Sequence, residues 1–408
     1  MKNEWMEKER EFSYWLCNIE GIGRITVLRL IREAGSAEKV YGMEEKALAG
    51  MLRPSQLMNF LKARQEKDVK REYQKLWSRG IRFIPLSDPE YPRRLSSIPD
   101  PPAGVYVRGE LPEETKPAAA VIGARMCSEY GRYVASWFAS ALSRAGVNII
   151  SGLARGIDGI SQEAAIRAGG KTYAVLGCGV DICYPEENRK IYDRIPGQGG
   201  ILSEFPPGML PKAAHFPVRN RIISGLSDVV LVVEARMKSG TLITVDMALE
   251  QGKDVFAVPG RITDTCSRGC NRLIGNGAGI AVSVAQLLQE LQGSVPHAGR
   301  DEAFSLTQAE RPNAAKAAGV IADKMLCPVT DALSSTASSS WPPLRKTIWQ
   351  ALDTMPQSMD EIADTLVRQK ISINVQMLMQ ELVFLELEGA AGSVMGRYYR
   401  KTFACNDG

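Results

Sequence analysis

The chain has 408 residues and a formal net charge of +4 at pH 7, with 45% hydrophobic and 24% charged residues. This length and composition are those of an ordinary soluble globular protein of two or three domains. Because the net charge is small, any affinity for nucleic acid must come from local clusters of cations. The charged start, MKNEWMEKEREF, excludes a signal peptide, and no run of about 18 apolar residues exists for a membrane span. We therefore expect a cytoplasmic protein without membrane insertion.

Residues 1–80 have a helical pattern. The segment IEGIGRITVLRLI, which begins at Ile19, places Gly21 and Gly23 between two apolar helices. Such a glycine turn is similar to a helix–hairpin–helix element, whose backbone N–H groups can bind a phosphate. Because the element occurs once and has few basic residues, a plain helix–turn–helix packing unit is the favoured interpretation. We expect a small N-terminal helical domain.

Residues 81–292 alternate strand-like apolar runs with helical ones. The runs are continuous rather than alternating, which is typical of strands in a parallel sheet that helices cover on both faces. The predicted fold class is α/β, with a central doubly wound, Rossmann-like parallel sheet. The candidate strands are residues 118–122, 147–150, 173–176, 200–204, 229–235 and 254–258.

The C-terminal part divides into a linker and a small ordered block. Residues 293–340 are rich in Ala, Ser, Thr and Gln, which favours a linker with some local helix. Residues 341–402 predict three helices and a small hairpin, the order of a winged-helix domain, with a capping box between Ser358 and Glu361. The third helix carries Glu381, Glu386 and Glu388, which favours a protein-contact or scaffold role over reading a DNA groove.

Glycine-rich loops follow the candidate strands, at the edge of a doubly wound sheet where ligands bind. They are residues 123–125, 151–158, 177–179, 238–241 and 259–261. Helix N-termini and free N–H groups converge at such an edge, so the loops predict an anion-binding rim, with mere tight turns as the alternative. Arg125 and Arg155 can reach this rim, although Arg155 could instead pair with Asp158.

The decapeptide KAAHFPVRNR, residues 212–221, concentrates cations around one aromatic ring. The guanidinium groups of Arg219 and Arg221 suit phosphates, and an exposed Phe216 ring gives a nucleobase a surface for stacking. The alternative is a charged loop in which Phe216 belongs to the core and Asn220 caps a helix.

No catalytic or metal-binding constellation is visible. The eight cysteines include no CxxC pair, and only two histidines are present, so we expect reduced thiols and neither a metal site nor a cofactor. A GxGxxG fingerprint and a Walker A motif are absent. Glu204 and Glu234 are best interpreted as structural carboxylates at strand ends, and Asp158 is the most plausible exception, although a role at a helix N-terminus suits it equally.

The ordered motifs GAR, SGLARGID, LGCGVDICYP, SEFPPG, FPVRNRIISGLSD, VVEARMKSGT and FAVPG resemble the DNA-processing protein A family, also called DprA or Smf. The resemblance covers roughly residues 81–291. It implies a non-catalytic, cytoplasmic homodimer that binds single-stranded DNA during natural transformation, shields it from nucleases, and loads the RecA recombinase, including onto strands coated by single-strand-binding protein.

Matching the motifs by position, Arg125, Arg219 and Arg221 would bind phosphates, Phe216 would stack a base, and Lys212 would approach the base. The full set implied to bind DNA is Gly123, Arg125, Ser151, Gly152, Arg155, Gly156, Gly177, Gly179, Lys212, Phe216, Arg219, Asn220, Arg221, Lys238, Ser239, Gly240 and Thr241.

Two departures from the family pattern are visible. Ala124 stands where the family often has a hydroxyl residue, and Ser161-Gln162 stands where an Ala-His pair is common. The second departure weakens an enzymatic interpretation without affecting DNA binding. The alternative functions on the same fold are a phosphoribohydrolase-like, nucleotide-processing enzyme, with Glu234 at the sugar, and a sensor of a small nucleotide.

Overall fold

The computed structural model describes residues 2–294, 341–353, 357–369, 371, 373–388, 390–394 and 397–400. The chain divides into two compact units, Met1–Pro296 and His297–Gly408. The first unit spans the residues of the two predicted domains, 1–80 and 81–292, as one compact unit. Beyond Ser294, the linker predicted for residues 293–340 lies outside the described residues.

The first part of this unit is helical, as predicted. Its helices are α1 (Lys2–Cys17), α2 (Arg24–Ala34), α3 (Ala37–Tyr41), α4 (Glu45–Ala49), α5 (Pro54–Glu66) and α6 (Val69–Trp77). They bury Trp15 and Phe60 in a core of their own. The glycine turn between α1 and α2 is fastened to α5, because the Gln56 and Asn59 side chains each donate a hydrogen bond, at 2.9 Å, to the carbonyls of Gly21 and Glu20.

A mixed sheet follows, with the strand order β1-β2-β6-β5-β4-β3-β7-β8-β9. Within this order, all neighbours from β6 through β5, β4, β3, β7 and β8 to β9 pair in parallel. At the other edge, β1 pairs antiparallel with β2, and β2 pairs antiparallel with β6. The six predicted strands are present in the parallel part of the sheet, and the antiparallel strands β1 and β2 at its edge were not predicted. The strands are β1 (Arg82–Pro85), β2 (Gly104–Gly109), β3 (Ala118–Ile122), β4 (Asn148–Ser151), β5 (Thr172–Val175), β6 (Gly199–Ser203), β7 (Val229–Val232), β8 (Asp254–Ala257) and β9 (Gly279–Ile280).

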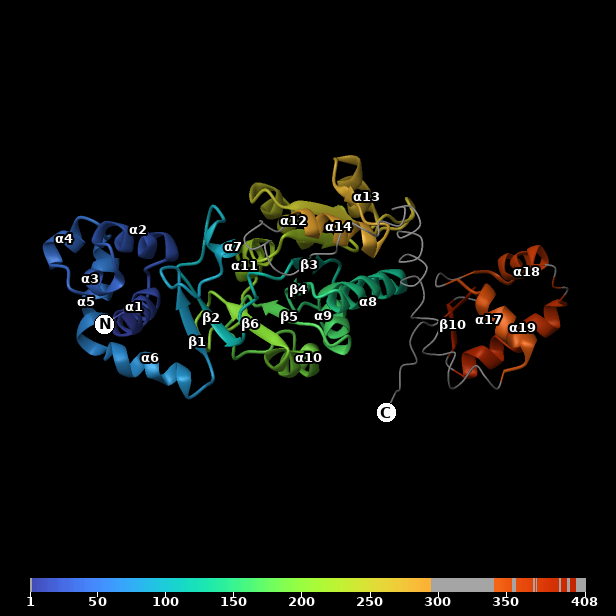
Figure 1. Cartoon of the computed structure of the whole chain (residues 1–408), viewed down its shortest axis with the longest axis horizontal. Coiled ribbons are helices and arrows are strands. Elements are labelled where there is room, and N and C mark those ends of the chain that lie inside the picture. Colours follow the sequence, from blue (N-terminus) through green and yellow to red (C-terminus); the bar gives the residue numbers. More distant parts are fainter. Residues whose placement is uncertain are drawn as a thin grey trace, which may run out of the picture. The chain divides into compact units, whose positions relative to one another are not determined.

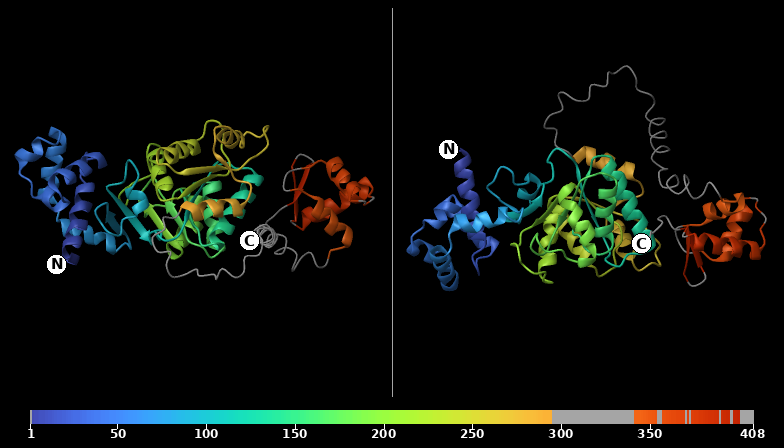
Figure 2. Two further views of the ribbon diagram at one scale, coloured as in Figure 1. Left: turned by 45° about the horizontal axis from the view of Figure 1, so that its top comes forward. Right: turned by 90° about the horizontal axis from the view of Figure 1, so that it is seen from below.

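Helices cover both faces of the sheet (Figures 1 and 2). One face packs against α8 (Glu129–Arg144), α9 (Ile157–Arg167) and α14 (Val284–Ser294). The other packs against α7 (Arg93–Ser96), α11 (His215–Gly225), α12 (Gly240–Glu250) and α13 (Arg268–Gly275). The remaining elements, η1 (Glu186–Asn188), α10 (Arg189–Arg194) and η2 (Ile195–Gly197), lie between β5 and β6.

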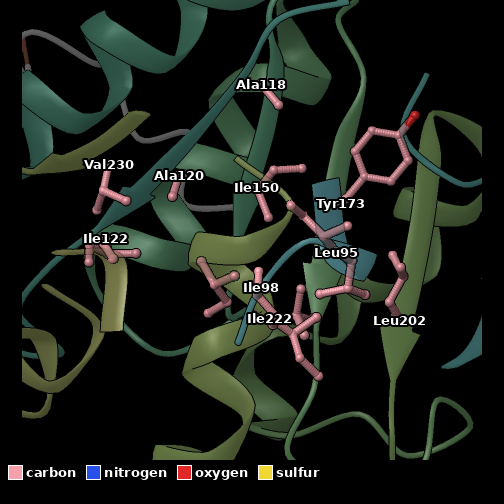
Figure 3. Close-up of a cluster of buried hydrophobic side chains, with 14 of the residues drawn as sticks. Leu95, Ile98, Ala118, Ala120, Ile122, Ile150, Tyr173, Leu202, Ile222 and Val230 are labelled. Carbon is pink, nitrogen blue, oxygen red and sulfur yellow. The ribbon is translucent and has the colours of Figure 1, made fainter. Parts of the chain in front are cut away.

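The side chains of β3 alternate between these two layers, as strand geometry requires. Ala119 and Val121 contribute to the core under α8, whereas Ala118, Ala120 and Ile122 contribute to the opposite core. Figure 3 shows this second core, in which Ile222 of α11 lies beside Leu95 and Ile98.

The direction of the chain reverses at β3. From β3 the chain builds β4, β5 and β6 on one side, then returns and builds β7, β8 and β9 on the other. The loops that leave β3 and β7 therefore diverge at the carboxyl ends of these strands. The crevice between the two loops is called the switch point, and it is where doubly wound sheets bind ligands. The fold places the glycine-rich loops around this point.

The second unit contains α17 (Pro343–Ala351), α18 (Met359–Arg368), α19 (Val375–Leu387) and a hairpin of β10 (Ala391–Val394) and β11 (Arg397–Arg400). The predicted helices and hairpin are thus present. The predicted capping box is also present: Glu361 N–H donates to Ser358 Oγ at 3.2 Å, and Ser358 N–H donates to Glu361 Oε2 at 2.7 Å.

Candidate nucleic-acid interface

An open pocket of about 640 Å³ lies at the switch point of the sheet. It is bounded by the loop after β3, the start of α9, the segment that leads into α11, and the loop between β7 and α12. Of the residues predicted to bind DNA, those that line it are Gly123, Arg125, Phe216, Arg219, Asn220, Lys238, Ser239, Gly240 and Thr241. The structure therefore brings together residues that are more than 100 positions apart in the sequence.

Phe216 lies in the first turn of α11, and its side chain is half-buried at the pocket wall. The Tyr184 ring is beside it, with 5.4 Å between ring centroids, and the guanidinium carbons of Arg125 and Arg219 lie 5.7 and 6.0 Å from the Phe216 centroid. Gly177 makes this packing possible, because a Cβ there would come within 2.9 Å of the ring. Phe216 is thus an accessible aromatic surface flanked by cations.

Arg219 is buried, only 4% exposed, yet it lines the pocket. Its Nη1 donates to the carbonyls of Gly152, at 2.9 Å, and Val175, and its Nε donates to Asn220 Oδ1 at 3.2 Å. Burial lowers the pKa of Arg219 to about 10, which still leaves a cation at neutral pH. A Cβ at Gly152 would come within 2.7 Å of the guanidinium, so a larger residue there would displace the Arg219 side chain.

Asp158 provides a carboxylate at the edge of the same pocket, in the first turn of α9. It is buried and accepts a hydrogen bond from Gly152 N–H at 3.1 Å. Burial raises the pKa of the Asp158 carboxyl, and the nearby Arg219 cation opposes this shift. Asp158 binds the N–H of Gly152 and Arg219 binds its carbonyl, so the two side chains hold the glycine loop after β4 in place.

Three exposed cations lie at the rim of the pocket. Arg125, Arg236 and Lys238 all line the pocket and are exposed. Within the part of the chain that the structure describes, no carboxylate lies within ion-pair distance of any of them. This open positive charge favours an anionic ligand. Sequence reasoning missed Arg236, although it stands in the quoted motif VVEARMKSGT.

Hydroxyl groups hold the loop between β7 and α12 in position. Ser239 caps α12 by accepting a hydrogen bond from Thr241 N–H at 3.1 Å. Thr241 Oγ1 donates to the Gly123 carbonyl, also at 3.1 Å, and so joins this loop to the one after β3. Gly240, the first residue of α12, is exposed, so the positive end of the helix is open to the pocket.

Arg221 requires a correction to the sequence-based assignment. Its side chain does not line the pocket and is 6% exposed. It forms a bidentate pair with Glu204, at 3.0 and 2.6 Å, and its Nε donates to the Asp100 carbonyl at 2.9 Å. Because its donors are occupied in the interior, the geometry gives Arg221 a structural role instead of a phosphate contact.

Other predicted residues also lie off the pocket lining. Ser151 is buried and its Oγ donates to the Val121 carbonyl at 2.7 Å. Arg155 is exposed and pairs with Glu187, not with Asp158. Lys212 is exposed between the lining residues Pro211 and Ala213. The remaining positions are the glycines Gly152, Gly156, Gly177 and Gly179, each of which allows a close approach that a Cβ would block.

The carboxylates considered for catalysis have structural partners. Glu234 is buried and accepts hydrogen bonds from the N–H and Oγ of Ser128, the N-cap of α8. Glu204 pairs with Arg221. Neither lines the pocket. The Nδ1 atom of His215 lies 3.1 Å from the Gly177 carbonyl oxygen. The His215 ring stacks on the Phe205 ring, with 4.1 Å between the centroids.

Two features are absent from the residues that the structure describes. No group of His, Cys, Asp or Glu side chains there is arranged to hold a metal ion. Nor does any helix in those residues have the length and apolarity that crossing a membrane requires.

Comparisons with known proteins point to one family. Residues 82–292 match the family model of DNA recombination-mediator protein A. Protein Smf of Synechocystis sp. is 36% identical over 306 residues, which cover 70% of this chain and 74% of that protein. DNA processing protein DprA of Streptococcus pneumoniae is 40% identical over 245 residues, covering 60% and 85%. The X-ray structure of DNA processing protein A from Streptococcus pneumoniae aligns with a TM-score of 0.61 and 35% identity, covering 69% of this chain and 97% of that one.

Proposed function

The chain belongs to the DNA recombination-mediator protein A family, and from that premise we propose that its switch-point pocket binds single-stranded DNA. The observation that carries the proposal is the half-buried Phe216 ring, with Arg125 and Arg219 within 6.0 Å of its centroid in an open pocket. An aromatic face surrounded by cations fits a nucleotide chain, which is a row of aromatic bases on an anionic backbone.

Single strands fit this arrangement better than duplexes do. A base can stack on Phe216 only when it has left its own base stack, which costs little in a single strand. The unpaired Arg125, Arg236 and Lys238 would contact the backbone phosphates on either side of that base. Such contacts are electrostatic and do not depend on sequence, so they give an affinity that falls with salt.

The proposed role of this binding in the cell is taken from the family to which the chain belongs. We propose a non-catalytic mediator that protects incoming single strands in the cytoplasm during natural transformation. It would act as a homodimer through the central sheet domain and load RecA, also onto strands coated by single-strand-binding protein. We further propose that the three helices and hairpin of the second unit form a winged-helix domain. The relatives from Streptococcus pneumoniae and Bacillus subtilis that are named for DNA processing support a role in DNA metabolism.

The enzymatic alternative depends on a free carboxylate in the pocket. Glu234, the residue it would use at the sugar, is engaged with Ser128, which leaves Asp158 as the acidic lining residue. Asp158 is itself bound to Gly152 N–H. Incubation of the purified protein with nucleoside monophosphates tests this alternative: release of free base would establish it, and calorimetry with the same nucleotides would detect a nucleotide sensor.

Fluorescence anisotropy of labelled oligo-dT and of a duplex of equal length, across a range of salt concentrations, tests the proposal. We expect tighter binding of the single strand, an affinity that falls as salt rises, and protection of the strand from a nuclease. Equal affinity for both forms would contradict it. Light scattering tests the homodimer separately, since a monomer mass at working concentration would exclude it.

A further inference from the structure

Tyr184 is an exposed aromatic residue at the switch-point pocket that the sequence-based assignment of DNA contacts did not include. It lies in the loop between β5 and η1, whereas Phe216 lies on α11. The Tyr184 side chain lines the pocket and is 42% exposed, and Phe216 is half-buried. Of these two neighbouring rings, Tyr184 is therefore the more open to a ligand.

The Tyr184 and Phe216 rings lie too close to each other for a base to enter between them. Their centroids are 5.4 Å apart and their planes are inclined by 31°. A base between two rings needs about 7 Å of space, because atoms in contact lie about 3.5 Å apart on each side of it. The rings therefore do not enclose one base, and a base must stack on the surface that each ring turns toward the pocket.

Two neighbouring rings suit two neighbouring bases. Consecutive nucleotides lie about 3.4 Å apart along a stacked strand and farther apart when the strand is extended, so the 5.4 Å between the ring centroids fits a partly extended strand. Some RNA-binding sheets use aromatic side chains in this way to stack two or three bases. The exposed cation Arg125, 5.7 Å from the Phe216 centroid, is close enough to bind the phosphate that joins the two nucleotides.

We propose that Tyr184 stacks a second base beside the base on Phe216, so that the pocket binds two consecutive nucleotides of a single strand. This inference rests on the proposed binding of single-stranded DNA and adds a contact residue to that site. Stacking uses the face of the aromatic ring and tolerates any base, because every base has a π-face. The Tyr184 hydroxyl is not needed for it, so phenylalanine should serve equally well at this position.

A supporting role for Tyr184 is the alternative that an experiment must separate from stacking. Tyr184 packs against Phe216, so its removal would also weaken DNA binding if it only held the Phe216 ring in place. The two roles differ once the Phe216 ring is absent. A supporting residue then has nothing left to support, whereas a stacking residue keeps its own base.

A double-mutant cycle on the affinity of the full chain for labelled oligo-dT, measured by fluorescence anisotropy, separates the two roles. Tyr184→Ala should weaken binding by about 5- to 150-fold, the range for one stacked base, and Tyr184→Phe should bind as wild type does. In the Phe216→Ala background, Tyr184→Ala should weaken binding by about threefold or more again, which exceeds the roughly twofold scatter of independent substitutions. A smaller further loss would overturn the proposal.

Tyr184→Leu provides a second variant for the same comparison. Leucine keeps apolar bulk beside Phe216 but has no aromatic face, so this variant should weaken binding nearly as much as Tyr184→Ala does. Wild-type affinity of Tyr184→Leu would show that the ring only supports Phe216. Because Tyr184 is exposed, these variants should fold, which circular dichroism checks.

Strands of abasic nucleotides that carry either one thymine or two adjacent thymines test the proposal from the DNA side. Wild type should bind the strand with two thymines about fivefold more tightly or better, because the second thymine finds a ring of its own. Tyr184→Ala should reduce this gain to about twofold or less, the statistical advantage of offering one ring two bases. Equal gains for wild type and Tyr184→Ala would overturn the proposal.

The failure of this inference can be distinguished from the failure of the proposed function. If Phe216→Ala weakens oligo-dT binding and Tyr184→Ala does not, the second stacking position is wrong and the proposed function stands. If neither substitution changes the affinity, the switch-point pocket is not the site of DNA binding and both proposals fail.

Discussion

The replacement Phe216→Ala tests the role of the aromatic ring in the pocket. The ring has Tyr184 on one side, at 5.4 Å, and faces the open pocket between Arg125 and Arg219. It can therefore stack about one base, which contributes about 1–3 kcal/mol. Because 1.4 kcal/mol corresponds to tenfold, we expect affinity for oligo-dT to fall by about 5- to 150-fold. The salt dependence should not change, because phenylalanine carries no charge.

Fluorescence anisotropy with labelled oligo-dT, repeated at several salt concentrations, measures both quantities. Trp77→Ala is the control, because Trp77 is an aromatic residue of α6 that is 62% exposed and lies off the pocket lining. It should bind as wild type does. An unchanged affinity of Phe216→Ala would refute base stacking on this ring. A weakened affinity with a reduced salt dependence would refute it as well, because it would show that the variant had displaced the neighbouring cations.

Three further predictions concern charged residues. Arg125→Ala should lower the slope of log affinity against log salt by about 0.7, the value for one phosphate contact of a single strand. Arg155→Ala is the control and should leave the slope unchanged, because the Arg155 side chain lies off the pocket lining. Equal slopes for both variants would contradict the site. Arg221→Ala should lower the free energy of unfolding in urea by about 3 kcal/mol, because it leaves Glu204, whose side chain is only 10% exposed, without its cation. Wild-type stability would show that the pair is not structural. Burial raises the pKa of Asp158, so its proton contributes to stability below the unfolded pKa and that contribution is lost as pH rises through the folded pKa. Asp158→Asn should therefore lose less stability than wild type from acid to neutral pH in urea unfolding, and parallel pH profiles would argue against this assignment.

The sequence was sufficient to predict the central layer of the fold. Continuous apolar runs such as 118–122 identify buried parallel strands, and the structure has β3 at that position. The antiparallel strands were missed for a physical reason. Arg82–Pro85 begins with an exposed Arg82 and ends at a proline, so it lacks the continuous apolar run of a central strand. Its partner, Gly104–Gly109, begins and ends at glycine.

Arg219 and Arg221 show where the sequence was insufficient. The motif KAAHFPVRNR does not by itself reveal its secondary structure, so the sequence predicts that both arginines reach one ligand. In the structure they lie on α11, and residues two apart on a helix point about 200° away from each other. Arg219 therefore reaches the pocket, and Arg221 reaches Glu204 on the other side.

Which cations remain free was also not visible in the sequence, because pairing depends on tertiary contacts. Arg155 and Arg125 stand in similar glycine loops, but only Arg155 has an acidic partner within reach, Glu187. Arg236 precedes the predicted contact segment by two residues, and only the path of the loop after β7 places it in the pocket lining. The loops were predictable, whereas the direction of each side chain was not.

The most direct test of the proposed interface is the salt dependence of oligo-dT binding by the triple variant Arg125→Ala/Arg236→Ala/Lys238→Ala. These cations line the pocket and are exposed, so the fold should tolerate their removal. Because each phosphate-binding cation contributes about 0.7 to the slope of log affinity against log salt, that slope should fall by about 2 relative to wild type. A slope equal to that of wild type would show that single-stranded DNA binds elsewhere on the protein.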